Sequence, residues 1–176
     1  EFFDILENFN KRTILASADG HKQTFEYSRY PAKWDKFLKN IHLIKQRLDP
    51  DDFFANAYTY SAYTVFDLVD TLEFYRTQLD FDFPVWLNPV WQSFYKVDVL
   101  PSALKDKLIQ DIKQTYNTDY NMNGSKDLSP IVTSLIQHSD EKNWHEFKRI
   151  TKMRDKMRNI SIIDVIPELK DYWHED

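Results

Sequence analysis

Short β-prone runs alternate with amphipathic helical stretches in the first half of the sequence, and this alternation constrains the fold more than any other feature. Runs at 13–18, 53–58 and 85–90 have the length and residue types of strands. The stretches between them repeat apolar side chains at helical spacing. Strands that alternate with helices form right-handed crossovers and a parallel sheet. We therefore expect an α/β fold.

The most regular helical pattern covers residues 32–48, where apolar side chains recur every three or four positions and lysines occupy the remaining faces. Pro50 ends this helix, because a proline disfavours helical backbone at the residue before it. A second amphipathic pattern covers residues 65–79. These are the helices expected to connect the three strands.

Two further segments are predicted to be extended. Residues 23–28 alternate weakly in polarity, and residues 94–99 alternate strictly, which is typical of a strand with one face in water. Because proline at position 89 interrupts the run before them, residues 94–99 are expected to form a separate strand.

The second half of the sequence is mainly helical. Helices are predicted to begin at Ser102, Ser129, Asp140 and Ser161. The Asn- and Asp-rich stretch 118–126 is predicted to be a loop. We divide the chain into an α/β part, 1–101, and a helical part, 102–176, that packs on it within one structural domain.

Composition excludes several kinds of chemistry. The 176 residues contain no cysteine, which excludes disulfides, thiol nucleophiles, zinc ribbons and thiolate-held iron–sulfur clusters within this sequence. The five histidines are scattered without metal-ligand spacing, and the net charge of -5 disfavours sequence-independent nucleic-acid binding. No stretch approaches the roughly 20 apolar residues of a membrane span, and the first residues of this sequence lack the basic-then-apolar pattern of a secretion signal. We expect a cytoplasmic protein without a membrane partner.

Polar residues cluster where the first predicted strand ends. Ser17 and Asp19 belong to the turn after this strand, and Arg29 follows shortly before the first long helix. Ligand chemistry gathers at the carboxyl ends of parallel strands. We therefore expect these three side chains to share one cavity. The alternative is an ordinary turn with Arg29 on the surface.

The order of these residues resembles the middle of twitch-type radical S-adenosylmethionine (SAM) enzymes. The resemblance includes the S-x-D-G turn, the arginine, and the following P-x-K-W-x-x-F-x-x-N-I. It continues in W-L-N-P-V at 86–90, in V-L-P at 99–101 with Lys105, and in Asp155-x-x-Arg158-x-x-Ser161. It therefore extends over essentially the whole chain. It implies a partial parallel (β/α) barrel with a mostly helical C-terminal segment.

The resemblance also implies that this chain is the C-terminal part of such an enzyme, truncated at its N-terminus. The family holds a 4Fe-4S cluster in a C-x3-C-x2-C loop, which this sequence lacks. Residues 1–6 look like the interior of a helix without a cap, as expected of a fragment. The intact enzyme would cleave SAM to a 5'-deoxyadenosyl radical that abstracts hydrogen from a substrate. The substrate could be a peptide, a nucleic acid or a small molecule, and this segment alone would be inactive.

By this resemblance, Ser17 and Arg29 would contact the methionyl carboxylate of SAM, and Asp19 would shape the turn and line the cavity. Arginine suits such a role because its planar guanidinium can hold a carboxylate with two hydrogen bonds. No residue of this sequence receives a catalytic or metal-binding role.

Three more residues would complete this side of the SAM pocket. Ser61 would reach the ribose or the methionyl group, while Asn88 and Val90 would border the adenine. A structural turn is an equal alternative for Ser61. Core packing is the alternative for Val90.

A second hypothesis rests on the basic segment 142–158, which contains seven lysines and arginines with Trp144 and His145 nearby. Basic residues mixed with aromatics can bind RNA or an acidic peptide. The chain would then be a non-catalytic α/β binding module. The alternative is a solvated helix face, partly balanced by acidic neighbours. An unrelated nucleotide-binding fold is a weaker option, since the sequence lacks a glycine-rich phosphate loop.

Overall fold

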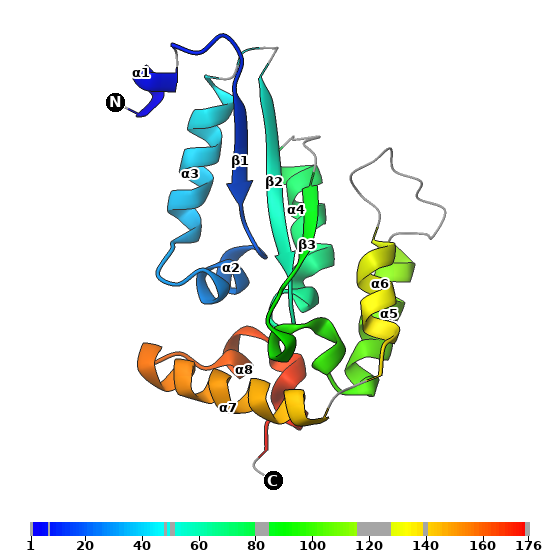
Figure 1. Ribbon diagram of the computed structural model, residues 1–176. Helices are drawn as coiled ribbons and strands as arrows, with labels where there is room; N and C mark the ends of the chain where they lie inside the picture. Colours follow the sequence, from blue (N-terminus) through cyan, green and yellow to red (C-terminus); the bar gives the residue numbers. More distant parts are fainter. Residues whose placement is uncertain are drawn as a thin grey trace.

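The computed structural model describes residues 2–6, 8–47, 49, 52–79, 85–115, 128–138 and 141–174 (Figure 1). Within them, β1 (Thr13–Ser17), β2 (Phe53–Tyr60) and β3 (Val85–Pro89) form a parallel sheet in the order β1-β2-β3. The three predicted strands and the α/β class are confirmed. The sheet is open, and β1 and β3 are its edges among the described residues.

Two helical connections join the strands, as the periodicity predicted. α2 (Lys22–Ser28) and α3 (Trp34–Lys45) lie between β1 and β2, and α4 (Leu68–Gln78) lies between β2 and β3. A short N-terminal helix, α1 (Phe2–Leu6), precedes β1. Right-handed crossovers place successive helices on the same face of a parallel sheet.

The two faces of the sheet differ in burial. Phe54 and Tyr58 of β2 are buried in one cluster with Ile41 of α3 and Leu68 of α4. The side chains that alternate with them project from the opposite face. We call this the open face, and its exposed members are Thr13, Leu15, Ser17, Trp86 and Asn88. Leu15 and Trp86 are each 45% exposed, so this face combines apolar and polar groups in contact with water.

The prediction of an extended segment at 23–28 is wrong, because Lys22–Ser28 forms α2. The buried side chains of this helix include Phe25, which packs against Trp34 and Phe37 of α3 with ring centroids 5.2 and 4.9 Å apart. A helix of seven residues is too short for its periodicity to be distinguished from weak alternation. Packing against α3 therefore decides its conformation.

The strand predicted at 94–99 is also wrong. The segment forms two 3-10 turns, Ser93–Tyr95 and Val97–Val99. A strand needs a neighbour for its backbone groups. Here the backbone N–H groups of Tyr95 and Val99 donate to carbonyls three residues earlier, at 3.0 and 3.4 Å. Val97 and Val99 of the second turn are both buried. The alternating polarity therefore reflects burial of every second side chain and not hydrogen bonding to a neighbouring strand.

The second half is helical, as predicted: α5 (Ser102–Thr115), α6 (Ser129–Ile136), α7 (Glu141–Arg158) and α8 (Ile162–Val165), followed by a 3-10 turn at Pro167–Tyr172. Asp140 and the predicted loop 118–126 lie outside the described residues. Figure 1 shows α7 and α8 beyond the carboxyl ends of the strands. None of the described helices is long and apolar enough to cross a membrane.

Candidate functional site

Asp19 and Arg29 form an ion pair at the carboxyl end of β1. Nη2 of Arg29 lies 2.8 Å from Oδ2 of Asp19, and Oδ1 of Asp19 accepts the backbone N–H of Thr59 at 2.7 Å. The hydroxyl of Ser28 donates to the backbone carbonyl of Asp19 at 2.9 Å. Asp19 and Arg29 therefore meet, but the prediction was that both share one cavity with Ser17, and neither of the two cavities of 450 and 290 Å³ is lined by any of the three. The ion pair therefore lies just beyond the last residue of β1 and beside β2.

The turn that positions Asp19 depends on two residues with special roles. Asn56 is fully buried in β2, where its Oδ1 accepts the N–H of Ala18 at 3.1 Å and its Nδ2 donates to the carbonyl of Ala18 at 3.3 Å. Gly20 has a φ of 98°, a conformation that other residues rarely adopt. Together they fix the chain direction at the end of β1, which holds Asp19 beside β2.

The guanidinium of Arg29 retains a donor that the ion pair does not use. Its Nε is buried, and among the described residues it has no hydrogen-bond acceptor. An unsatisfied buried donor costs about 1–3 kcal/mol, so such groups are rare away from ligand sites. The Arg29 side chain is 32% exposed in total, so atoms of this side chain other than the buried Nε reach solvent. A guanidinium has five N–H donors, and the ion pair with Asp19 does not use all of them.

Ser17 and Asn88 lie on the open face. The register pairs Ser17 with Ala57 and Asn88 with Thr59, so both side chains project to the same side of the sheet. The usual spacings along and between strands place these two residues about 12 Å apart. Nδ2 of Asn88 donates to the carbonyl of Trp86 at 3.4 Å. Asp19 lies in the plane of the sheet instead, because it binds a backbone N–H of β2.

Ser61 and Val90 follow β2 and β3. Ser61 is buried, its Oγ accepts the N–H of Tyr63 at 3.2 Å, and it lies 3.2 Å from Oγ1 of Thr64. These contacts favour the structural-turn alternative for Ser61. Val90 is half-buried, and its N–H donates to the carbonyl of Tyr60 at 3.3 Å, which extends the β2–β3 ladder by one bond.

The contact between His21 and Asp67, in the same region, was not predicted from the sequence. Nδ1 of His21 lies 2.9 Å from Oδ1 of Asp67, whose other oxygen accepts the N–H of His21 at 2.6 Å and the hydroxyl of Thr71 at 3.0 Å. The His21 ring stacks on Phe74 with centroids 5.7 Å apart. These contacts join the start of α2 to the start of α4. His21 and Asp67 are 46 positions apart, and no sequence spacing indicates that they pair.

Two buried tyrosines lie near these acids. Burial and, to a smaller extent, nearby carboxylates including Asp19 raise the pKa of Tyr75 above its ordinary value. Burial, with Asp67 as the next cause, also raises the pKa of Tyr58, whose hydroxyl donates to the carbonyl of Thr64 at 2.7 Å. Both phenols therefore remain protonated and add no negative charge to this region.

The basic segment of α7 is largely used within the molecule. Lys148 is buried and its Nζ lies 3.4 Å from the carbonyl of residue 174. Arg154 lies over the ring of Tyr95 and donates to its hydroxyl at 3.0 Å. Arg158 donates to the carbonyl of Tyr27 at 3.1 Å. Much of the charge that suggested a nucleic-acid surface therefore stabilises the packing of α7.

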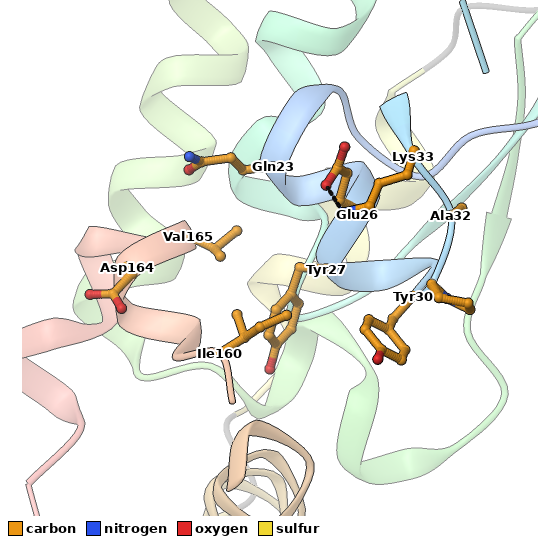
Figure 2. Close-up of a pocket in the computed structure, with 10 residues that line it drawn as sticks. Gln23, Glu26, Tyr27, Tyr30, Ala32, Lys33, Ile160, Asp164 and Val165 are labelled. Atoms are coloured by element: carbon orange, nitrogen blue, oxygen red, sulfur yellow. Dashed lines mark hydrogen bonds and ion pairs between the residues drawn. The ribbon is translucent and has the colours of Figure 1, made fainter. Parts of the chain in front are cut away.

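Two cavities formed by described residues have no strand residue in their walls. One of 450 Å³ lies beside α2 and α8 (Figure 2), and one of 290 Å³ lies beside the start of α7. Neither is lined by any of the six predicted SAM contacts. In the part of the chain that the structure describes, no group of three or more His, Cys, Asp or Glu side chains is arranged to hold a metal ion.

Comparisons with protein families, with curated proteins and with solved structures find no match for this chain. Function is therefore inferred from the residues of this chain and their geometry.

Proposed function

We propose that the chain is part of a radical SAM enzyme and that the carboxyl ends of β1, β2 and β3 form one side of the SAM pocket. The observation that carries this proposal is Arg29, whose guanidinium is anchored by Asp19 and keeps a buried Nε donor without an acceptor among the described residues. The methionyl carboxylate of SAM would accept from this guanidinium, and would reach Nε after a shift of the side chains that cover it. The S-x-D-G turn that precedes Arg29 supports the same assignment.

The proposal requires that this sheet be part of a (β/α) barrel. Three features support it: all strands are parallel, the connections are helical, and the open face combines apolar Leu15 and Trp86 with polar Ser17 and Asn88. In a barrel this face would line the interior, and β1 and β3 would pair with further strands. Those strands would come from polypeptide outside the 176 residues.

Within this pocket the chain would bind and orient SAM. Arg29 would hold the carboxylate, Ser17 would donate a hydroxyl hydrogen bond to the same end, and Asn88 with Val90 would border the adenine. Bound SAM supplies the hydrogen-abstraction chemistry of the family. A 4Fe-4S cluster does not fit this chain, because the sequence has no thiolate to hold it. Its ligands would also lie outside these residues. The substrate would be a peptide, a nucleic acid or a small molecule.

Calorimetric titration with SAM and with decarboxylated SAM, which lacks only the methionyl carboxylate, tests the role of Arg29. We expect SAM to bind more tightly than decarboxylated SAM. Arg29→Ala should weaken SAM binding about 10- to 100-fold, the loss expected for charged hydrogen bonds, and should remove the difference between the two ligands. Arg76→Ala is the matched control, since Arg76 is exposed on α4 and pairs with Glu73. Equal binding of both ligands to the unmodified chain would refute the assignment.

Peptide mapping of the native polypeptide tests the wider proposal. We expect a longer protein in which a C-x3-C-x2-C segment precedes this sequence. A native polypeptide without such a segment, in a cell that supplies no cluster-bearing partner chain, would contradict it.

A second candidate function is supported by the exposed part of α7. Lys142 and Lys156 are exposed there, and Met157 is 79% exposed. A non-catalytic module that binds RNA or a peptide would use this surface. The double variant Lys142→Glu/Lys156→Glu should then abolish salt-dependent RNA binding, while Lys107→Glu/Lys113→Glu on α5 should not. Unchanged binding in the α7 variant would eliminate this candidate.

A further inference from the structure

The 450 Å³ cavity lies between α2, the turn that follows it, and the connection from α7 to α8. Figure 2 shows Tyr27 and Ile160 between Asp164 and Val165 on one side and Tyr30 on the other. Its volume falls within the range of small-molecule sites, about 300–1,000 Å³. It is separate from the strand ends to which SAM is assigned.

The walls of this cavity are held in place by hydrogen bonds between distant segments. The hydroxyl of Tyr27 donates to Oδ1 of Asp155 at 2.7 Å, and Oδ2 of Asp155 accepts the N–H of Ile162 at 2.8 Å. Arg158 donates to the carbonyl of Tyr27 and lies 4.8 Å from the centre of the Tyr30 ring. The cavity is therefore preformed, which lowers the entropy cost of binding.

The charges around the cavity do not balance. Glu26 and Lys33 both line it, and they neutralise each other through a 3.0 Å ion pair. Behind the tyrosines, Asp155 and Arg158 also have opposite charges. Asp164 also lines the cavity, and its carboxylate, which Figure 2 shows directed away from Tyr27 and Tyr30, has no hydrogen-bond or ion-pair partner in the described part of the chain. One negative charge therefore remains at the rim.

We propose that this cavity binds a small organic cation, an ammonium or guanidinium group carried on an apolar body. Tyrosine rings attract cations through the negative face of the ring. Tyr27 and Tyr30 both line the cavity, and Arg158 already makes this interaction with one face of the Tyr30 ring. Asp164 supplies the counter-charge, and Ile160 with Val165 contacts the apolar body. The positive charge of Lys33 at the cavity is matched by the negative charge of Glu26, 3.0 Å away.

The test is an NMR titration of the 176-residue chain with three probes that share one ring and differ in charge: phenethylamine, 2-phenylethanol and phenylacetate. The methyl resonances of Ile160, Val165 and Ala32 report on the cavity. We expect phenethylamine to produce saturable shifts at these methyl groups and to bind at least fivefold more tightly than 2-phenylethanol. Phenylacetate should produce none.

Variants at exposed positions test the role of charge without disturbing the core. Asp164→Asn should weaken phenethylamine binding about two- to fivefold, the range expected for an exposed ion pair. Gln23 also lines the rim, so Gln23→Arg should weaken binding and Gln23→Glu should strengthen it. Asp111→Asn, an exposed acid on α5, is the matched control and should change nothing. A thermal melt of each variant verifies that it is folded.

Three results would overturn the proposal: no saturable shift with any probe, equal binding of the cation and the neutral alcohol, or unchanged affinity in folded Asp164→Asn. A further titration with Nα-acetyl-lysine methylamide distinguishes the source of the cation. Binding of this probe as tight as that of phenethylamine indicates a basic side chain of a peptide, and weaker binding indicates a free amine. SAM plays no part in these measurements, so their failure would leave the role of Arg29 standing.

Discussion

The hydroxyl of Tyr27 donates a 2.7 Å hydrogen bond to the carboxylate of Asp155, which lies 128 positions further along the chain. The second oxygen of Asp155 accepts the backbone N–H of Ile162 at 2.8 Å. A single carboxylate in α7 therefore holds both α2 and the start of α8. This contact joins the α/β half of the chain to the helical half, next to the carboxyl ends of the strands.

Tyr27→Phe should therefore destabilise the protein. The substitution removes a hydrogen bond to a charged acceptor while keeping the buried ring, and we expect the free energy of unfolding to fall by about 1.5–3 kcal/mol. Urea denaturation followed by circular dichroism measures this change. Tyr30→Phe is the control, since Tyr30 is 50% exposed, and it should leave the midpoint unchanged. Equal midpoints for the two variants would show that the Asp155 contact is not stabilising.

Low pH should lower the free energy of unfolding, because it protonates Asp52. Hydrogen bonds from the Arg12 guanidinium lower the pKa of Asp52 to about 2. Because this pKa lies below the unfolded value of about 3.9, the stabilisation is complete above that value and is lost as the pH falls towards 2. We expect Asp52→Asn to be less stable at pH 7 and to show a smaller decline in stability between pH 4 and pH 2.

Urea denaturation at a series of pH values measures this slope. The control is Asp35→Asn, an exposed acid at the start of α3, which should keep the slope of the unmodified chain. If Asp52→Asn retained the full acid-dependent decline, other carboxylates would have to cause it.

Lys105 supports the junction between α5 and the end of α6. It is 4% exposed, and its Nζ donates to the carbonyls of Gln137 at 2.6 Å and Asp98 at 3.3 Å. Lys105→Met keeps the apolar stem but leaves both carbonyls without this donor, so we expect a loss of about 1–3 kcal/mol in the free energy of unfolding. Lys107→Met, at an exposed position of the same helix, should have little effect. An unchanged free energy of unfolding in Lys105→Met would mean that water replaces the ammonium as the donor to these two carbonyls.

Gly20→Ala should strain the turn that positions Asp19. The residue has a φ of 98°, and an added Cβ would lie 2.7 Å from Cγ2 of Thr24 and 2.9 Å from Oδ2 of Asp67. We expect a loss of about 1–3 kcal/mol from the backbone conformation alone. The double variant Gly20→Ala/Thr24→Ser removes one of the two clashes and should recover part of the loss. Full recovery would show that the contact, and not φ, restricts this position.

The sequence predicted the sheet well because strand and helix signals are local. The apolar runs at the three strands and the repeat of α3 depend only on neighbouring residues, and each was found within a few positions of its true bounds. The two errors concern short segments. α2 becomes helical through packing against Trp34 and Phe37, and residues 94–99 form turns because no described strand pairs with them.

The candidate site was predicted only in part for the same reason. Asp19 and Arg29 were both expected at the carboxyl end of the first strand because they follow it closely in sequence, and they meet there although a helix, α2, and not an extended segment connects them. The pairing of His21 with Asp67 left no periodic signal. Ser61 appeared accessible in the sequence, but Tyr63 and Thr64 enclose it in a turn.

The sequence by itself determined the α/β class, the positions of the strands and the polar residues that follow them, since these depend on the order of residue types along the chain. Only the tertiary structure decided that Tyr27 meets Asp155, that Lys148 is buried, and that a cavity lined in part by Asp164 opens beside α2. The physical reason is distance along the chain. Hydrogen bonds, burial and charge balance depend on which remote segments pack together, and residue spacing does not encode that.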